Sequence, residues 1–207
     1  DGRVYLYEES SNLWPIRGVE LDPENYYIPK GTQVDLFNPD PENHGWERFG
    51  QDHSSDVAPF IEGPWMVKHD STYYLMYGAP GTQWNVYADG VYTSDNPLGP
   101  FTYAPYNPVA YKPGGFLNGA GHGSAVRDNN GNHWHFSTMA ISVNYKFERR
   151  LGMYPAGFEE NGQMYVNTAY GDYPHYLPDV EVEDHKHRFT GWMLLSKDKP
   201  VKSNSVL

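Results

Sequence analysis

The chain has 207 residues, and its 26 acidic and 15 basic side chains give a formal net charge of -11 at pH 7. Such a chain offers no cationic face for a phosphate backbone, so nucleic acid is not an expected partner. The absence of cysteine excludes disulfides, thiolate metal ligands and cysteine nucleophiles. The longest apolar runs hold only a few residues, whereas roughly 20 are needed to cross a bilayer, so membrane insertion is not expected.

The composition indicates short strands joined by tight turns, because aromatic residues make up 16% of the chain beside 21 Gly and 17 Pro. A turn dipeptide followed by an aromatic strand recurs along the sequence. The turns are Asp1-Gly2, Asp70-Ser71, Asn130-Gly131 and Asn161-Gly162. Intervals of roughly 30 to 70 residues between these units are typical of a β-propeller, whose blades are small antiparallel sheets. We therefore expect an all-β propeller with minimal helix, in which the strands around Tyr5, Tyr74, Trp134 and Tyr165 belong to successive blades.

Further elements are predicted between and after these units. Residues 33–37 form a weak strand, and residues 87–93 form a strand before a turn fixed by Asn-Pro and Gly-Pro. Residues 183–189 are short, rich in His and without an apolar face, so they are expected to be loop. Residues 191–196 are expected to form the strand that closes the propeller.

Glu62 is a single carboxylate between two apolar pairs, in the run Phe60-Ile61-Glu62-Gly63-Pro64-Trp65-Met66. Partial desolvation is expected there. It would raise the pKa of the carboxyl group, as a proton donor near neutral pH requires. The alternative is that Glu62 caps a turn made by Gly63-Pro64.

Two further stretches hold candidate site residues. Glycines flank His122 on both sides, which lets the backbone approach whatever the imidazole faces. The alternative is an imidazole satisfied by backbone carbonyls. Arg149 and Arg150 precede Pro155, and a guanidinium there could bond sugar hydroxyls, or the pair could be solvated and bonded to Glu148.

These motifs, in this order, resemble glycoside hydrolase family 43 from residue 1 to about residue 173. The resemblance rests on Glu-Gly-Pro-aromatic at Glu62, Gly-His-Gly at His122, and an Arg upstream of Pro155. It implies a five-bladed propeller in which Glu62 is the general acid, and Arg149, or alternatively Arg150, contacts substrate. It also implies that His122 contacts a metal ion on the propeller axis, or its water shell; Ca²⁺ would suit the hard ligands. The candidates for stacking on the sugar, which could equally be core residues, are Trp65, Trp84 and Phe116.

The implied activity is hydrolysis with inversion. Glu62 would protonate the leaving oxygen, and an Asp about 6.5 to 9.5 Å away would activate water on the opposite face. The expected substrates are oligo- or polysaccharides of plant type with terminal arabinofuranosyl, xylosyl or galactosyl residues, and the expected location is extracellular or periplasmic. The alternatives are a non-catalytic carbohydrate-binding propeller and a propeller that serves as a protein-interaction scaffold.

The resemblance also predicts which parts of a parent protein the chain contains. The general base and a second Asp that tunes the acid are expected upstream of residue 1. Residues 1–196 are then expected to be a propeller without its first blade. Residues 197–207 are expected to be a linker or the start of a discoidin-like carbohydrate-binding module. If the chain is instead complete, Asp35, Asp52 and Asp56 are the carboxylates to test as the base.

Overall fold

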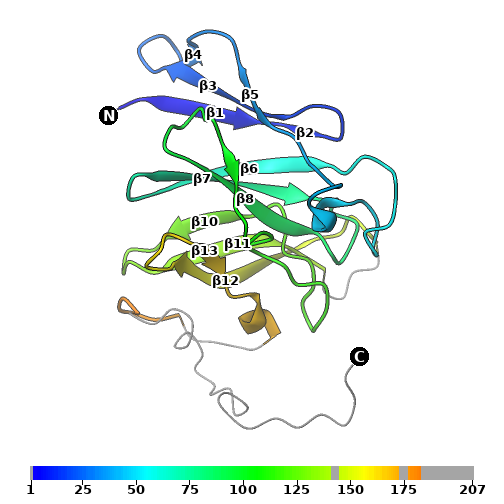
Figure 1. The fold of residues 1–207 in the computed structure, drawn as a ribbon. Helices are drawn as coiled ribbons and strands as arrows, with labels where there is room; N and C mark the ends of the chain where they lie inside the picture. The colour runs from blue at the N-terminus through cyan, green and yellow to red at the C-terminus, as the bar shows by residue number, and fades with distance from the viewer. Residues whose placement is uncertain (1, 141–144, 173–176, 183–207) are drawn as a thin grey trace, which may run out of the picture.

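The computed structural model describes residues 2–140, 145–172 and 177–182 (Figure 1). Regular structure in these ranges is almost entirely β, accompanied by the short 3-10 helices η1 (Gly45–Glu47) and η2 (Thr168–Asp172). The predicted all-β class is confirmed. No helix in the described ranges is long and apolar enough to cross a membrane.

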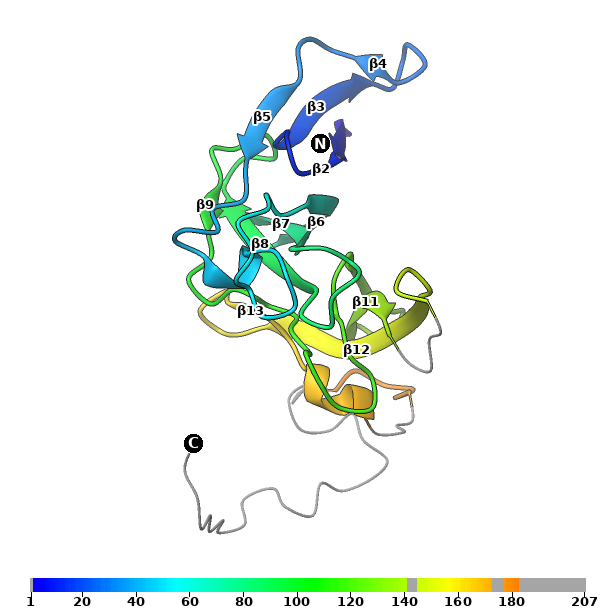
Figure 2. The ribbon, with the colours of Figure 1, turned by 90° about the vertical axis from the view of Figure 1, so that its right-hand side faces the viewer.

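The described strands form three antiparallel sheets that follow one another along the chain, except that the short strand β2, between β1 and β3, joins the second sheet. The first sheet holds β1 (Val4–Glu8), β3 (Ile16–Asp22), β4 (Ile28–Pro29) and β5 (Val34–Phe37). The second holds β2 (Ser10–Ser11), β6 (Ile61–His69), β7 (Thr72–Ala79), β8 (Ala88–Ser94) and β9 (Thr102–Tyr103). The third holds β10 (Ser124–Arg127), β11 (His133–Met139), β12 (Arg150–Phe158) and β13 (Met164–Val166). Figure 2 shows the same succession from β3 and β5 at the top to β12 below.

Three of the predicted turn dipeptides lie in hairpins. Asp70-Ser71 joins β6 to β7, with His69 paired to Thr72 and Asp70 at a φ of 50°. The other two dipeptides join β10 to β11 and β12 to β13. Residues that tolerate a positive φ are what tight hairpins require, so these turns could be read from the sequence. The predicted strands at residues 33–37 and 87–93 also form, as β5 and β8.

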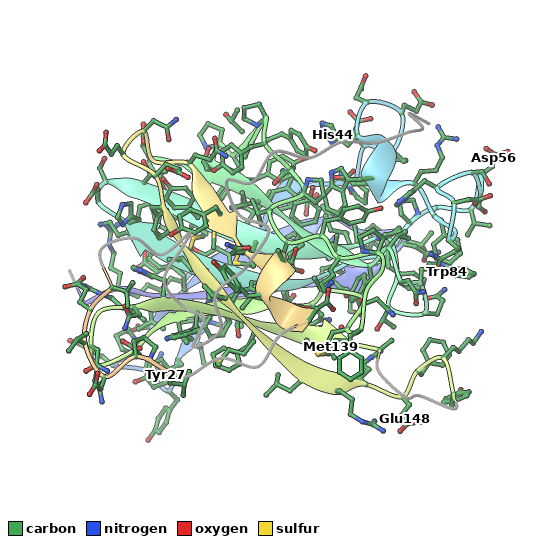
Figure 3. All side chains as sticks on the ribbon, turned by 90° about the horizontal axis from the view of Figure 1, so that it is seen from below. Tyr27, His44, Asp56, Trp84, Met139 and Glu148 are labelled. Carbon is green, nitrogen blue, oxygen red and sulfur yellow. The ribbon has the colours of Figure 1, made fainter. Side chains whose placement is uncertain are left out.

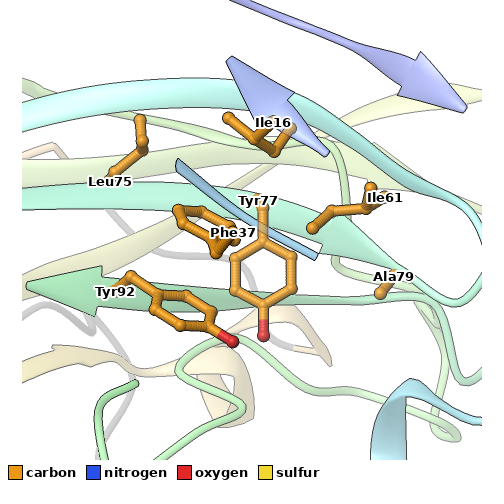
Figure 4. Close-up of a cluster of buried hydrophobic side chains, with 7 residues drawn as sticks. All are labelled: Ile16, Phe37, Ile61, Leu75, Tyr77, Ala79 and Tyr92. Atoms are coloured by element: carbon orange, nitrogen blue, oxygen red, sulfur yellow. The ribbon is translucent and has the colours of Figure 1, made fainter. Parts of the chain in front are cut away.

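The second sheet is buried on both faces because side chains of β7 alternate between its neighbours. Leu75 and Tyr77 pack toward the first sheet, in a cluster that includes Ile16 and Phe37 (Figure 4). Phe37 also stacks on Tyr92 of β8, with ring centroids 3.9 Å apart.

On the opposite face, Tyr74 and Met76 pack with Ala125 of β10 and Met164 of β13. Three sheets stacked face to face in chain order are arranged as the blades of a propeller are, and the predicted all-β propeller class is confirmed.

One part of the predicted blade assignment is wrong. Trp134 lies in β11 and Tyr165 in β13, and both strands belong to the third sheet. A turn followed by an aromatic strand occurs twice in this blade because each of its hairpins uses such a turn. The predicted loop at residues 183–189, the closing strand at 191–196 and the domain boundary near 196 lie outside the described residues.

Candidate active site

Glu62 is the second residue of β6, beside a bulge in that strand. It pairs with Gly78 of β7, and the register shifts by one residue before Trp65 pairs with Met76. Gly63 provides the bulge with a left-handed φ of 62°, which glycine adopts without steric cost. The Gly-Pro pair after Glu62 thus forms an irregularity within a strand, and Glu62 is a strand residue rather than a turn cap.

Two hydrogen bonds hold the Glu62 carboxylate from opposite sides. The Tyr87 hydroxyl donates to Oε1 at 2.6 Å, and the Ser10 hydroxyl donates to Oε2 at 3.0 Å. Nδ1 of His122 lies 3.9 Å from Oε1, which is an ion-pair distance, and 3.4 Å from the Tyr87 oxygen. The Glu62 side chain is 14% exposed. Residues from β2, β6 and the segments before β8 and β10 therefore meet at one carboxylate.

The prediction that Glu62 has a raised pKa is wrong for this arrangement. Burial does favour the neutral acid, but the interactions with His122, Tyr87 and Ser10 outweigh it and lower the pKa of Glu62 from 4.5 to about 2. The sequence revealed the apolar neighbours of Glu62, whereas its three polar partners come from distant segments. Glu62 is consequently a carboxylate at neutral pH in this structure.

His122 has an unusual backbone conformation and a basic imidazole. Its φ is 55°, in the left-handed region that side chains rarely adopt, and such positions often occur at functional sites. The interaction with Glu62 raises the pKa of His122, burial opposes this, and the buried charge of Asp89 adds to the increase. His122 therefore faces Glu62 and Tyr87, and its ring makes no hydrogen bond to a backbone carbonyl in the described structure.

The predicted calcium ion does not fit the described residues on their own. No group of three or more His, Asp or Glu side chains in this part of the chain could hold a metal ion. His122 also directs Nδ1 toward Tyr87 and Glu62, so only Nε2 of this ring would be available to a metal. A metal role for His122 stays a prediction.

Tyr87, whose hydroxyl bonds Glu62, also lines a cavity of about 140 Å³. Arg149 also lines it, with Nε donating to the Thr82 hydroxyl at 2.9 Å. Two buried polar atoms of the lining, Nε1 of Trp84 and Oδ1 of Asn118, have no hydrogen-bond partner among the described residues. Figure 3 shows the lining residues Trp84, Met139 and Glu148 on one side of the molecule and Tyr27 on the other. A free donor and a free acceptor beside a guanidinium can bind vicinal hydroxyl groups.

The other predicted substrate residues do not line this cavity. Arg150 pairs with Glu148, as the alternative interpretation had it. Phe116 is 70% exposed in the loop before β10, so it is not a core residue. Trp65 is 40% exposed, and its Nε1 donates to the Ala125 carbonyl at 2.9 Å. Arg149 and Trp84 are thus the two predicted substrate residues that line the cavity together with Tyr87.

The family was decided by comparison with known proteins. Residues 1–164 match the model of glycosyl hydrolases family 43. The chain belongs to this family. The matched region contains Glu62, His122 and Arg149, so the family 43 resemblance seen in the sequence is confirmed.

Family 43 structures share the fold. The crystal structure of a thermostable family-43 glycoside hydrolase is similar with a TM-score of 0.63 and 25% identity, over 80% of this chain and 54% of that one. An endo-1,4-beta-xylanase from Bacteroides thetaiotaomicron is similar with a TM-score of 0.64 and 21% identity, over 81% and 55%. The chain thus spans about half the length of these two structures.

A curated relative within glycoside hydrolases is more similar over a short segment. The beta-D-galactofuranosidase xynD of Aspergillus niger is 41% identical over 52 residues, which are 24% of this chain and 15% of that enzyme. This segment is too short to transfer a substrate.

Sequence reasoning missed the two residues that bond directly to Glu62. Ser10 lies in the two-residue strand β2, and nothing in its neighbourhood singles it out. Tyr87 immediately precedes β8. The sequence feature that accompanies its position is a pair of glycines elsewhere in the chain, which leave room for its ring. A Cβ at Gly78 would come within 2.7 Å of the Tyr87 hydroxyl, and one at Gly121 within 2.6 Å of its ring. Only the folded chain shows that these small residues make room for Tyr87.

Proposed function

We propose that the protein is a glycoside hydrolase that removes terminal sugars from oligo- or polysaccharides, with Glu62 as the general acid. The observation that carries this proposal is Tyr87, which bonds Glu62 and also lines the cavity together with Arg149 and Trp84. A family 43 chain in which one residue links a buried carboxylate to a polar cavity has components that glycosidic bond cleavage needs.

In this proposal the sugar binds in the cavity and Glu62 protonates the departing oxygen. Arg149 and Asn118 bond its hydroxyl groups, and the Trp84 N–H donates to another. A second carboxylate activates water on the opposite face of the sugar, which inverts the anomeric carbon. A like charge near Glu62 would also raise its pKa, so an adjacent Asp would convert the ionised group described above into an acid. The resemblance predicts that these carboxylates lie outside this chain.

The proposed substrates carry arabinofuranosyl, xylosyl or galactosyl residues at their ends. Two relatives have names that agree with this range, namely the xylanase and the galactofuranosidase. An extracellular or periplasmic location is proposed with it, because such polymers are too large to enter cells. We also propose a calcium ion near His122 and a carbohydrate-binding module after residue 196.

Aryl glycosides of arabinofuranose, xylose and galactose test this function. Glu62→Gln keeps the shape of the side chain but cannot donate a proton. We expect activity on substrates with poor leaving groups to fall by roughly 10² to 10⁴ fold, and activity on good leaving groups to fall less. Glu20→Gln in the first sheet, whose carboxylate pairs with Lys30, is the matched control and should change neither. Equal losses on both substrate classes would contradict an acid role for Glu62.

The second candidate function is a carbohydrate-binding propeller without catalysis. The low pKa of Glu62 favours it, because a carboxylate that stays ionised binds hydroxyl groups but cannot act as an acid. Calorimetry with the same sugars separates the two functions. Binding without any release of free sugar, in this chain and in any longer form of the protein, would support the binding module.

A further inference from the structure

We propose that Tyr87 is a positioning residue that holds Oε1 of Glu62 and thereby makes Oε2 the oxygen that carries the catalytic proton. The inference rests on the proposed function, since it names the reacting atom of the proposed acid. It is argued from the contacts of the two carboxylate oxygens.

The Tyr87 hydroxyl is fixed before any substrate arrives. Tyr87 is 1% exposed, and its hydroxyl lies 2.6 Å from Oε1, the short end of the range for hydrogen bonds between oxygens. Gly78 and Gly121 pack against the phenol so closely that a Cβ at either position would collide with it. The ring thus has no room to turn away. Burial, followed by the nearby Glu62 charge, raises the pKa of Tyr87 well above its usual value, so the phenol keeps its hydrogen and donates it.

The two oxygens of Glu62 therefore face different surroundings. Oε1 faces the buried phenol and the imidazole of His122. Oε2 faces Ser10, an exposed residue in β2, whose hydroxyl can rotate from donor to acceptor when Oε2 is protonated. A proton on Oε1 would have to displace the Tyr87 bond, whereas a proton on Oε2 leaves that bond intact.

The remaining groups around this unit are His122, Asp89 and Arg149. Asp89 is buried with Tyr87, whereas His122 is exposed, and the charge of Arg149 acts on Tyr87 and His122 from the cavity. None of these three forms a hydrogen bond with Oε2 in the described structure. The tyrosine and the serine thus account for the hydrogen bonds of the carboxylate.

The chemical step follows from this arrangement. The O–H bond at Oε2 breaks as the proton moves to the glycosidic oxygen, and the bond from that oxygen to the anomeric carbon breaks with its electron pair going to the leaving group. The electron pair of the broken O–H bond stays on Glu62 as carboxylate charge. The Tyr87 hydrogen bond at Oε1 stabilises that charge, because a bond to the ionised form is stronger than one to the neutral acid.

Tyr87→Phe tests the proposal, and Tyr77→Phe is its matched control. Tyr77 is also a buried tyrosine whose hydroxyl donates to a glutamate, Glu47, but it packs between the first and second sheets. With aryl glycosides of poor leaving groups, we expect Tyr87→Phe to lower kcat on the order of 10²-fold with little change in KM, because the acid is displaced rather than the sugar. Tyr77→Phe should lower stability by a similar amount and leave kcat unchanged.

A second measurement does not need activity. Carbon-13 labelling of Glu side chains gives one carboxyl resonance for each glutamate, and the resonance that disappears in Glu62→Gln belongs to Glu62. At pH 7 we expect Tyr87→Phe to shift this resonance and Tyr77→Phe to leave it in place. An unmoved Glu62 resonance in Tyr87→Phe, or a loss in KM alone, would overturn the proposal. If the wild type, in a form that contains the second carboxylate, hydrolyses nothing, the proposed function fails, and the resonance still decides whether Tyr87 holds Glu62.

Discussion

Nε2 of His135 lies 2.7 Å from Oδ2 of Asp89, and both side chains are almost completely buried between β11 and β8. A Cβ at Gly123 would come within 2.2 Å of both groups, so the backbone that follows His122 packs directly on this pair. The pair therefore supports the loop that brings His122 to Glu62.

Replacing one member of the His135–Asp89 pair should lower the free energy of unfolding. His135→Ala leaves the Asp89 carboxylate buried without its partner, and breaking a buried pair in this way costs about 3 to 5 kcal/mol of the free energy of unfolding. Urea denaturation followed by tryptophan fluorescence measures the loss. His133→Ala, two residues earlier in β11, is the control and should cost less. Equal losses in the two variants would mean that the pair contributes nothing particular to the fold.

The interaction of Glu62 with its partners should appear in the pH dependence of stability. The pKa of Glu62 is lower in the folded chain, about 2 against 4.5, so the folded state binds this proton less tightly than the unfolded state. The stabilisation is therefore present above about pH 4.5 and is lost as the pH falls toward 2. His122 has a raised pKa, so its contribution is present below 6.5 and is lost as the pH rises through its folded value. The two contributions overlap between about pH 4.5 and 6.5.

Melting temperatures of the wild type and of Glu62→Gln, measured from about pH 2.5 to about pH 8, test this window. We expect the melting temperature of the wild type to exceed that of the variant most near about pH 5.5, and the difference to disappear below about pH 3. A constant difference over the whole range would show that the carboxylate charge does not contribute to folding stability.

The neighbouring arginines should behave differently in sugar binding. Arg149 lines the cavity, and its Nε bonds Thr82, whereas Arg150 does not line it and pairs with Glu148. Arg149→Ala should weaken sugar binding, or raise KM, by about tenfold, since one hydrogen bond to a charged group contributes roughly 1.5 to 3 kcal/mol. Arg150→Ala should change either quantity by less than about twofold, because exposed ion pairs contribute little. The opposite order would mean that the substrate contact belongs to Arg150.

Substitutions at Trp84 and Phe116 test whether the sugar binds in the cavity or on the exposed loop before β10. Trp84→Phe removes the buried N–H that has no partner in the described structure, and it keeps an aromatic ring against Phe49. If that N–H binds a sugar hydroxyl, affinity should fall by about 3 to 10 fold, the value of one neutral hydrogen bond. Phe116→Ala should have no effect on monosaccharide binding. Titration calorimetry with the best of the three sugars measures both variants, and a larger loss in Phe116→Ala would place the sugar on the loop instead.

The fold could be predicted from the sequence mainly where local chemistry decides the structure. Asp70-Ser71 and Asn161-Gly162 favour tight hairpins by themselves, and the strands that follow them formed as expected. The number of blades could not be read in the same way, because one sheet uses two such hairpins. Which hairpins share a sheet depends on pairing between β11 and β12, and therefore on contacts across a long connection.

The site was predictable as a set of positions and not as an electrostatic environment. Glu62, His122 and Arg149 belong to motifs that the sequence displays, and the structure brings them into one region. The direction of the Glu62 pKa was wrong because it depends on Tyr87 and Ser10, which contact it only in the folded chain. Hydrogen bonds between distant segments leave no pattern in a single sequence, whereas burial by apolar neighbours does.

The bulge at Gly63 has a consequence for how β6 can move. Glu62 and Trp65 are three residues apart, so plain alternation would place them on opposite faces, yet each is paired with a β7 residue on the same face, Gly78 and Met76. Pro64 has no N–H to offer the ladder, so the strand cannot slide by one residue and regain regular pairing. Slippage that begins at the His69–Thr72 hairpin would thus stop before it reached Glu62. Insertions or deletions in the turn between His69 and Thr72 should therefore leave the position of Glu62 unchanged. A change of length between Glu62 and Trp65 should displace it.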